Sequence, residues 1–290
     1  MPEHRADSPD NAQQLLITLG RLVDQALEGI KLQRARVELA MALQRHMLPS
    51  ELPQLPGVRI AARYSPARDG LAVGGDWYDA FMMLDGSLGL AIGDAQGHDV
   101  EAVAFMGQVR TSLRALAEAT SDPREVLSRT NDLLISMGFG LFATCCFLRF
   151  DPVGRDLTVS RAGHVPMIWA TAGGGSGIAL DRGGPPLGIV RGERYPVTHR
   201  RLIEAGVLVL LTDGVVEGPT YPMEAGLDEV LRLVRAGFDA DPEVLASAVI
   251  KVAELTGHRD DAAVLVARYD GPAAGRPDQG VSGGSGASPA

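Results

Sequence analysis

Four aspartates stand at the ends of short apolar runs, each beside a glycine or a second aspartate. They are Asp76 in GGDWYD, Asp94 in GDAQGHD, Asp213 in TDGVVE and Asp260 in RDDAAVL. A buried strand delivers a carboxylate at its end to the rim of a sheet, and a flanking glycine lets backbone or ligand come close. One Asp-Gly pair after a strand is usually a turn. Four such aspartates in one domain favour a shared chemical site.

Carboxylates that converge on one rim repel one another and raise one another's pKa. A divalent cation removes that conflict, and a set of oxygen ligands suits Mg²⁺ or Mn²⁺. Zinc would need nitrogen or sulfur ligands at close spacing, which the sequence does not offer. The two cysteines, Cys145 and Cys146, are adjacent in an apolar run, where neighbours on a strand face opposite ways. We therefore expect no disulfide between them and an inert place in the core.

The elements that must position these aspartates follow from the apolar pattern. Strands are predicted over residues 58–64, 77–84, 88–93, 141–150, 157–162, 167–172, 207–211 and 263–269, and helices over 100–120, 123–137, 223–236 and 242–255. Strands come in hairpin-like runs and helices in pairs, unlike the regular alternation of a doubly wound parallel sheet. This order predicts an α+β domain with two antiparallel sheets at its centre and helices outside.

A helix is predicted ahead of this domain. Residues 11–47 carry apolar residues at alternating three- and four-residue spacing, interrupted by Gln33 and Gln44. Two interpretations stay open: a helix packed on its own domain, or a coiled coil that dimerises or transmits a signal. Three prolines within residues 49–56 must end the helix.

The chain therefore divides into four parts. Residues 1–10 are expected to be disordered, residues 11–49 to form a linker helix, and residues 50–270 to form one folded domain. Residues 271–290, rich in Gly, Ser, Pro and Ala, are expected to be a disordered tail.

Composition narrows the class of protein. The 290 residues are 46% hydrophobic, enough for a sizeable core, and 27 Lys and Arg against 36 Asp and Glu give a net charge of −9. This acidic balance argues against a nucleic-acid-binding surface, which needs clustered positive charge. Apolar runs are too short to span a bilayer, and the polar start of the chain is unlike a secretory signal. We expect a cytoplasmic protein.

Seven motifs in order add a family likeness. Besides the four aspartate segments, they are LQRHMLP at residues 43–49, AGHVP at 162–166 and GPPLGI at 184–189. Together they resemble the metal-dependent PPM (protein phosphatase 2C-like) phosphatases, in their bacterial SpoIIE/RsbU-type branch. The likeness covers residues 43–268 in collinear order, which is far more specific than any one motif.

The resemblance implies a four-layer α-β-β-α sandwich that hydrolyses phosphoserine or phosphothreonine on proteins, with two Mn²⁺ or Mg²⁺ ions at one end. By position, Asp94 would bridge both ions and Asp76 would hold the second, directly or through water. Asp213 and Asp260 would hold the first ion, and the carbonyl of Ala95 would complete one shell. Asp94 and Asp76 are therefore the predicted catalytic residues. A water activated by the ions would attack phosphorus in line, with no covalent intermediate.

The resembling branch acts on phosphorylated anti-sigma-factor antagonists, which are small STAS-domain proteins. This would place the chain in a partner-switching pathway, with a sensor protein or a second copy of the chain meeting the N-terminal helix. Two other hypotheses remain: a non-catalytic interaction or regulatory module that keeps the fold, and a hydrolase of small phosphoesters.

The segment around Asp94 departs from the branch's usual Asp-Val-x-Gly-His-Gly. Gln96 stands where many eukaryotic relatives carry a histidine proposed as the general acid, so no general acid is assigned. His98 is a candidate, with a capping or structural role favoured. Asp99 replaces a glycine, and it could alter the turn or add a carboxylate beside the metals.

Five further residues are ambiguous. His164 is interpreted as a hydrogen-bonded structural histidine. Asp79 and Asp261 are neighbours of stronger candidates and could support the metal ligands. Arg63 and Arg68 lie on the right segment for a phosphate-binding arginine, with nothing more specific to favour either.

Overall fold

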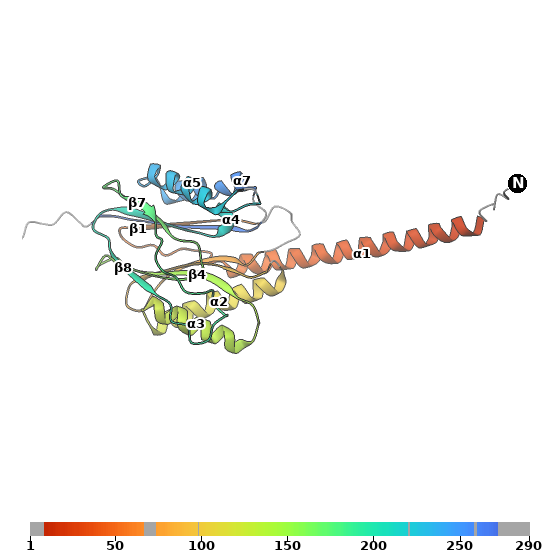
Figure 1. Ribbon diagram of the computed structural model, residues 1–290, viewed down its shortest axis with the longest axis horizontal. Helices are drawn as coiled ribbons and strands as arrows, with labels where there is room; N and C mark the ends of the chain where they lie inside the picture. The colour runs from red at the N-terminus through yellow and green to blue at the C-terminus, as the bar shows by residue number, and fades with distance from the viewer. Residues whose placement is uncertain (1–8, 67–73, 98, 220, 258–259, 272–290) are drawn as a thin grey trace, which may run out of the picture.

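Two antiparallel five-stranded sheets lie face to face in the computed structural model of the chain (Figure 1), which describes residues 9–66, 74–97, 99–219, 221–257 and 260–271. Sheet A has the order β1 (Val58–Ser65), β10 (Ala262–Tyr269), β9 (Gly206–Leu211), β6 (Ile168–Thr171) and β7 (Ser176–Ile178). Sheet B has the order β2 (Asp76–Met82), β3 (Leu88–Ala95), β4 (Ala143–Asp151), β5 (Asp156–Ala162) and β8 (Val197–Arg201). The predicted α+β class with two antiparallel sheets is confirmed.

Helices cover the outer face of each sheet, which gives the four layers seen in Figure 1. Sheet B is covered by α2 (Val100–Ala119) and α3 (Pro123–Met137), and sheet A by α4 (Asp213–Val216), α5 (Met223–Ala236), α6 (Pro242–Val249) and α7 (Val252–Thr256). Because side chains alternate along a strand, Leu90 and Ile92 of β3 face sheet A while Ala91 faces the helices. By the same alternation Asp94 lies on the face toward sheet A.

Some elements differ from the prediction. The helix expected over residues 242–255 is two helices, α6 and α7, because the bonds that Ala253 and Glu254 donate reach back only three residues, to Ile250 and Lys251. The short elements β7, β8 and α4 were not predicted. β8 is partly exposed along its length and lies at the edge of sheet B, so it lacks the apolar run that marks a buried strand.

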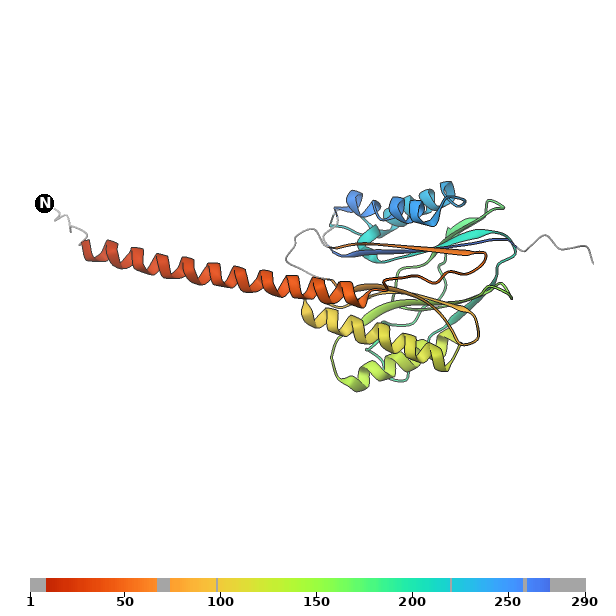
Figure 2. The ribbon, with the colours of Figure 1, turned by 180° about the vertical axis from the view of Figure 1, so that it is seen from behind.

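The N-terminal helix α1 (Pro9–Met47) projects away from the sandwich (Figures 1 and 2). It begins two residues before its predicted start and ends before Pro49, as expected. The side chains of residues 13–36 are exposed, whereas Val37, Met41 and Met47 pack against the core beside α2. Among the described helices, none combines the length and the apolar content that a bilayer crossing requires. The predicted disordered ends lie largely outside the described residues.

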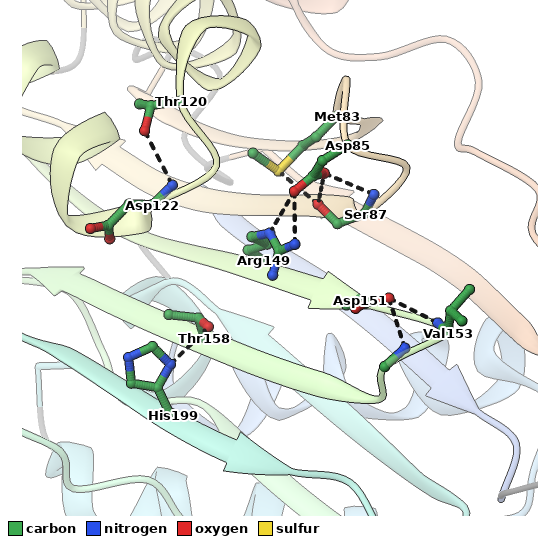
Figure 3. Close-up of polar contacts among 11 residues, drawn as sticks. Met83, Asp85, Ser87, Thr120, Asp122, Arg149, Asp151, Val153, Thr158 and His199 are labelled. Carbon is green, nitrogen blue, oxygen red and sulfur yellow. Dashed lines mark hydrogen bonds and ion pairs between the residues drawn. The ribbon is translucent and has the colours of Figure 1, made fainter.

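Polar turns close the end of sheet B that lies opposite Asp94 (Figure 3). Asp85, in the turn between β2 and β3, accepts a hydrogen bond from Ser87 N–H at 3.0 Å and pairs with Arg149 at 2.7 Å. Asp151 accepts bonds from the N–H groups of Val153 and Gly154, both at 2.9 Å, in the turn after β4. These turns fix the β2–β3 and β4–β5 pairings, and with them the register at the opposite end.

Candidate active site

Asp76 and Asp94 stand directly opposite each other on paired strands. Asp76 is the first residue of β2 and Asp94 the last but one of β3, and the register pairs the two. Both lie on the face of sheet B that looks toward sheet A, because they alternate in step with Tyr78 and Ile92. Asp76 is buried and Asp94 is half-buried. The two predicted catalytic residues are thus neighbours at the end of the sandwich.

Sheet A brings Asp213 and Asp260 to the same end. β9 ends at Leu211 and β10 begins at Ala262, and the two are antiparallel neighbours, so the residues that follow one and precede the other share an edge. The Thr212 hydroxyl donates a hydrogen bond of 2.7 Å to Asp76 Oδ2, which joins this edge to sheet B. The four predicted aspartates therefore converge from two sheets.

The pKa values of three of these aspartates reflect how close they lie to one another. Burial, followed by the charges of Asp213 and Asp260, raises the pKa of Asp94 to about 8. Burial and then the Asp94 charge raise the pKa of Asp76 well above its ordinary value, against a lowering by the bond from Thr212. Burial and the Asp260 charge also raise the pKa of Asp213. The charges of these carboxylates repel one another, which is the condition that a bound cation relieves.

The donor set fits a hard cation that keeps part of its water. Among the residues that the structure describes, no group of three or more His, Cys, Asp or Glu side chains is close enough to hold a metal by itself. Mg²⁺ retains several of its waters, so a carboxylate can hold it through a bound water without contacting the ion directly. The Ala95 carbonyl oxygen lies against Gly75, the residue before β2, and Ala95 directly follows Asp94.

Two glycines let the backbone close around the site. A Cβ on Gly75 would lie 2.1 Å from the Ala95 carbonyl oxygen, and one on Gly214 would lie 2.0 Å from that of Asp261. Neither approach is compatible with a side chain at the glycine. The glycines beside Asp76 and Asp213, predicted to permit close approach, are required by contacts with backbone.

The sequence left the role of Asp261 ambiguous and did not indicate which residues contact it. Asp261 is buried, and its Oδ2 accepts hydrogen bonds from Gly74 N–H at 2.9 Å, from Gln44 Nε2 at 2.8 Å and from the Tyr64 hydroxyl. Gln44 also donates to the Gly74 carbonyl at 2.9 Å. Burial, with the charges of Asp76 and Asp261, raises the pKa of Tyr64, which keeps its hydroxyl protonated. The one sequence signal was the break that Gln44 makes in the apolar seam.

Two ambiguous acidic residues have structural roles elsewhere. Asp79 lies on the opposite face of β2 from Asp76 and pairs with Arg110 at 3.0 Å and Arg114 at 3.5 Å, both on α2. Asp99 is the N-cap of α2, where its carboxylate accepts from Glu101 N–H at 3.1 Å and Ala102 N–H at 3.0 Å. The replacement of glycine by aspartate at this position is therefore explained by helix capping.

The remaining candidates are also placed. His164 is buried and hydrogen-bonded, through Thr144 at 2.8 Å and the Leu211 carbonyl at 3.1 Å, as a structural histidine should be. The Arg63 side chain lies against α6, where it donates a hydrogen bond to the Ser247 hydroxyl at 3.0 Å and forms an ion pair with Glu243. His98 and Arg68 lie outside the described residues.

The cysteines are inert, as predicted. Cys145 and Cys146 are both free and buried, and they pack in different layers, one toward the helices and one between the sheets. Burial raises the pKa of Cys146 to about 12 and raises that of Cys145 as well, so neither supplies a thiolate at neutral pH.

Comparison with known proteins gives a consistent likeness. Residues 84–270 match the family described as Stage II sporulation protein E (SpoIIE). The phosphoserine phosphatase RsbU of Bacillus subtilis is 26% identical over 221 residues, covering 75% of this chain and 65% of that protein. Protein IcfG of Synechocystis is 28% identical over 256 residues, covering 78% of this chain and 39% of that protein.

Solved structures agree. A crystal structure of the RsbU and RsbW domains of a Mycobacterium tuberculosis protein matches with a TM-score of 0.70 and 32% identity, over 78% of this chain and 64% of that one. The SiaA-PP2C domain of Pseudomonas aeruginosa matches with a TM-score of 0.67 and 21% identity, over 84% of this chain and 100% of that one. The second match supports the fold.

Proposed function

Because the chain belongs to the SpoIIE family, in the SpoIIE/RsbU branch of PP2C-type (PPM) phosphatases, we propose that it is a metal-dependent protein serine/threonine phosphatase. The observation that carries the proposal is the convergence of Asp76, Asp94, Asp213 and Asp260 from two sheets, with pKa values of three of them raised by burial and mutual charge. Such a cluster is unfavourable without a cation and favourable with one.

Each residue has a role in this proposal. Mn²⁺ or Mg²⁺ at the rim, two ions per site, supplies water of lowered pKa and neutralises charge on the phosphoryl oxygens. Asp94 would be shared by both ions, Asp76 would hold the second, directly or through water, and Asp213, Asp260 and the Ala95 carbonyl would complete the ligand set. Thr212 orients Asp76 through its hydrogen bond.

We further propose that the substrate is phosphoserine or phosphothreonine on an anti-sigma-factor antagonist of the STAS class. Support comes from the likeness to RsbU, which is named a phosphoserine phosphatase, and to a structure that contains an RsbU and an RsbW domain. The chain spans 65% of the length of RsbU and 39% of that of IcfG, so the partners of those longer proteins enter here as proposals.

Hydrolysis of p-nitrophenyl phosphate, and of a phosphoserine-bearing STAS-domain protein, tests the function. We expect turnover that requires added Mn²⁺ or Mg²⁺ and is lost in EDTA, with the phosphoprotein much preferred. Binding of Mn²⁺ without turnover of either substrate would instead favour the non-catalytic module. Preference for the small ester would favour a small-phosphoester hydrolase.

The projecting part of α1 is proposed to pair with a second copy of the chain. Its exposed apolar residues between positions 15 and 39 include Leu16, Leu19, Val23 and Ile30, each at least 50% exposed, along the predicted seam. Where the helix meets the domain, Arg110 donates to the Met47 carbonyl at 2.6 Å and Gln44 reaches Asp261. Pairing of α1 is thus proposed to be sensed at the site through Gln44.

Two variants separate pairing from sensing. Deleting residues 1–36 removes the exposed seam and keeps every residue from Val37 onward that packs on the core, so we expect a folded monomer by light scattering. Gln44→Met keeps the side chain's length and removes its donors, so we expect an unchanged mass with about 10-fold weaker Mn²⁺ binding, measured by calorimetry. A truncated chain with unchanged mass, or a Gln44→Met variant with wild-type affinity, would count against the corresponding half of the proposal.

A further inference from the structure

Two side chains join the sheets at the candidate site. The Thr212 hydroxyl, on the sheet A side, donates to Asp76 Oδ2 at 2.7 Å and accepts from Ala263 N–H at 2.9 Å. His164 lies between Thr144 of sheet B, at 2.8 Å, and the Leu211 carbonyl of sheet A, at 3.1 Å. We call Thr212 and His164, with these bonds, the sheet brace.

The direction of every bond in the sheet brace is fixed by chemistry. A carbonyl oxygen can only accept, so His164 Nε2 carries the proton toward Leu211, and Nδ1 accepts from the Thr144 hydroxyl. The Thr212 hydroxyl accepts from Ala263 N–H and donates to Asp76 Oδ2 at 2.7 Å, which is much closer than its other possible acceptor, the Ala263 carbonyl at 3.5 Å. Thr212 is 0% exposed and His164 is 3% exposed. Water therefore has little access to replace either link.

Both links end beside proposed metal ligands. Thr144 is paired with Asp94 in the β3–β4 register, and Leu211 and Thr212 immediately precede Asp213. The first link thus connects the Asp213 edge to Asp76 itself, and the second connects it to the strand partner of Asp94. The carboxylates of the two sheets repel one another, so a tie at this position opposes their separation.

We propose that Thr212 and His164 are positioning residues that set the spacing of the carboxylates across the two sheets. Thr212 occupies Asp76 Oδ2 and so limits the rotation of the carboxyl group that would hold the cation. His164 holds the strand end that carries Asp213 against the strand that pairs with Asp94. This inference rests on the proposed metal site.

Mn²⁺ titration of matched variants tests the inference, with binding measured by calorimetry and hydrolysis measured beside it. Thr212→Val removes the hydroxyl at nearly constant volume, and we expect Mn²⁺ affinity to fall by about 10- to 100-fold. Thr212→Ser restores the donor and should restore most of the affinity. In the hydrolysis assay, the Mn²⁺ concentration that gives half the maximal rate should rise by a larger factor than the factor by which kcat falls.

Sheet B offers a matched control. Thr158 is also buried and also contacts a histidine, His199, at 3.2 Å (Figure 3). This contact joins β5 to β8, at the side of sheet B away from β2 and β3. Thr158→Val should lose stability without losing Mn²⁺ affinity. A loss of affinity equal in Thr158→Val and Thr212→Val would show a general effect on folding and overturn the inference.

The remaining outcomes are distinct. A folded Thr212→Val variant with wild-type affinity overturns the inference and leaves the proposed function intact. A wild-type chain that binds no Mn²⁺ overturns the proposed function, and the inference with it. If Thr212→Val does not fold, His164→Gln replaces it: a folded His164→Gln with wild-type affinity overturns the inference, and weakened affinity supports it.

Discussion

Replacing Asp94 with asparagine is expected to lower phosphoester hydrolysis by at least about 1000-fold in a chain that still folds. Asp94 lies opposite Asp76 and within range of the charges of Asp213 and Asp260, so it is the carboxylate best placed to hold both proposed ions. Loss of metal-derived charge stabilisation is worth several kcal/mol, and each 1.36 kcal/mol is tenfold in rate. Mn²⁺-dependent turnover of wild type and variant, side by side, checks this.

The same substitution should change how stability depends on pH in EDTA. The pKa of Asp94 is raised from 3.8 to about 8, so the folded chain keeps a proton that the unfolded chain loses. The free energy of unfolding of the metal-free protein should therefore fall as pH rises from about 4 to about 8. Asp94→Asn should show a shallower fall, with the remainder due to Asp76 and Asp213.

Urea unfolding at several pH values, with and without Mn²⁺, provides the measurement. Added Mn²⁺ should flatten the wild-type profile, because bound cation neutralises the repulsion. Equal slopes in wild type and Asp94→Asn, or near-wild-type hydrolysis by the variant, would contradict the proposed role of Asp94.

Gly214→Ala is expected to have the second largest effect. The added Cβ would lie 2.0 Å from the Asp261 carbonyl oxygen, a backbone atom that cannot turn away, so the ends of β9 and β10 must separate. Those ends carry Asp213 and Asp260. We expect a stability loss of about 1–3 kcal/mol, typical of overpacking. We expect an activity loss of about 100-fold, the cost of misplacing catalytic groups by about 1 Å.

Gly177→Ala is the control for this substitution. Gly177 lies in β7 at the edge of sheet A, and a Cβ there would meet Trp169 no closer than 3.4 Å, an ordinary contact. Thermal melts and Mn²⁺-dependent rates of both variants should separate them clearly. Wild-type activity in Gly214→Ala would mean that the backbone here can relax without disturbing the aspartates.

The apolar pattern predicted the parts of the fold that are buried. β3, β9 and β10 are buried along most of their length, and their runs were recognised within two residues of the observed bounds. β8 was missed because its side chains are polar and partly exposed, so only its pairing with β5 defines it as a strand. The break between α6 and α7 lies inside one apolar run, where periodicity has no reason to change.

The site was predictable where residue type carries the signal. Three of the aspartates stand beside glycines and Asp260 stands beside a second aspartate, all at strand ends, and the structure brings them to the same end of the sandwich. Thr212, Tyr64 and Gln44 carry no such signal: Thr212 meets Asp76 across 136 residues, and Gln44 meets Asp261 across 217. Such contacts depend on how two sheets pack, which a single sequence does not display.

The strand order of sheet A has a consequence for the timing of protein synthesis. Among the described strands, β1 pairs with β10, which is completed about 200 residues later in the chain. A ribosome adding roughly 5–20 residues per second needs at least about 10 s for that interval. Until β10 emerges, the nascent chain carries Asp76 and Asp94 without Asp260, and β1 lacks that neighbour. An incomplete nascent chain therefore cannot assemble the full set of proposed metal ligands.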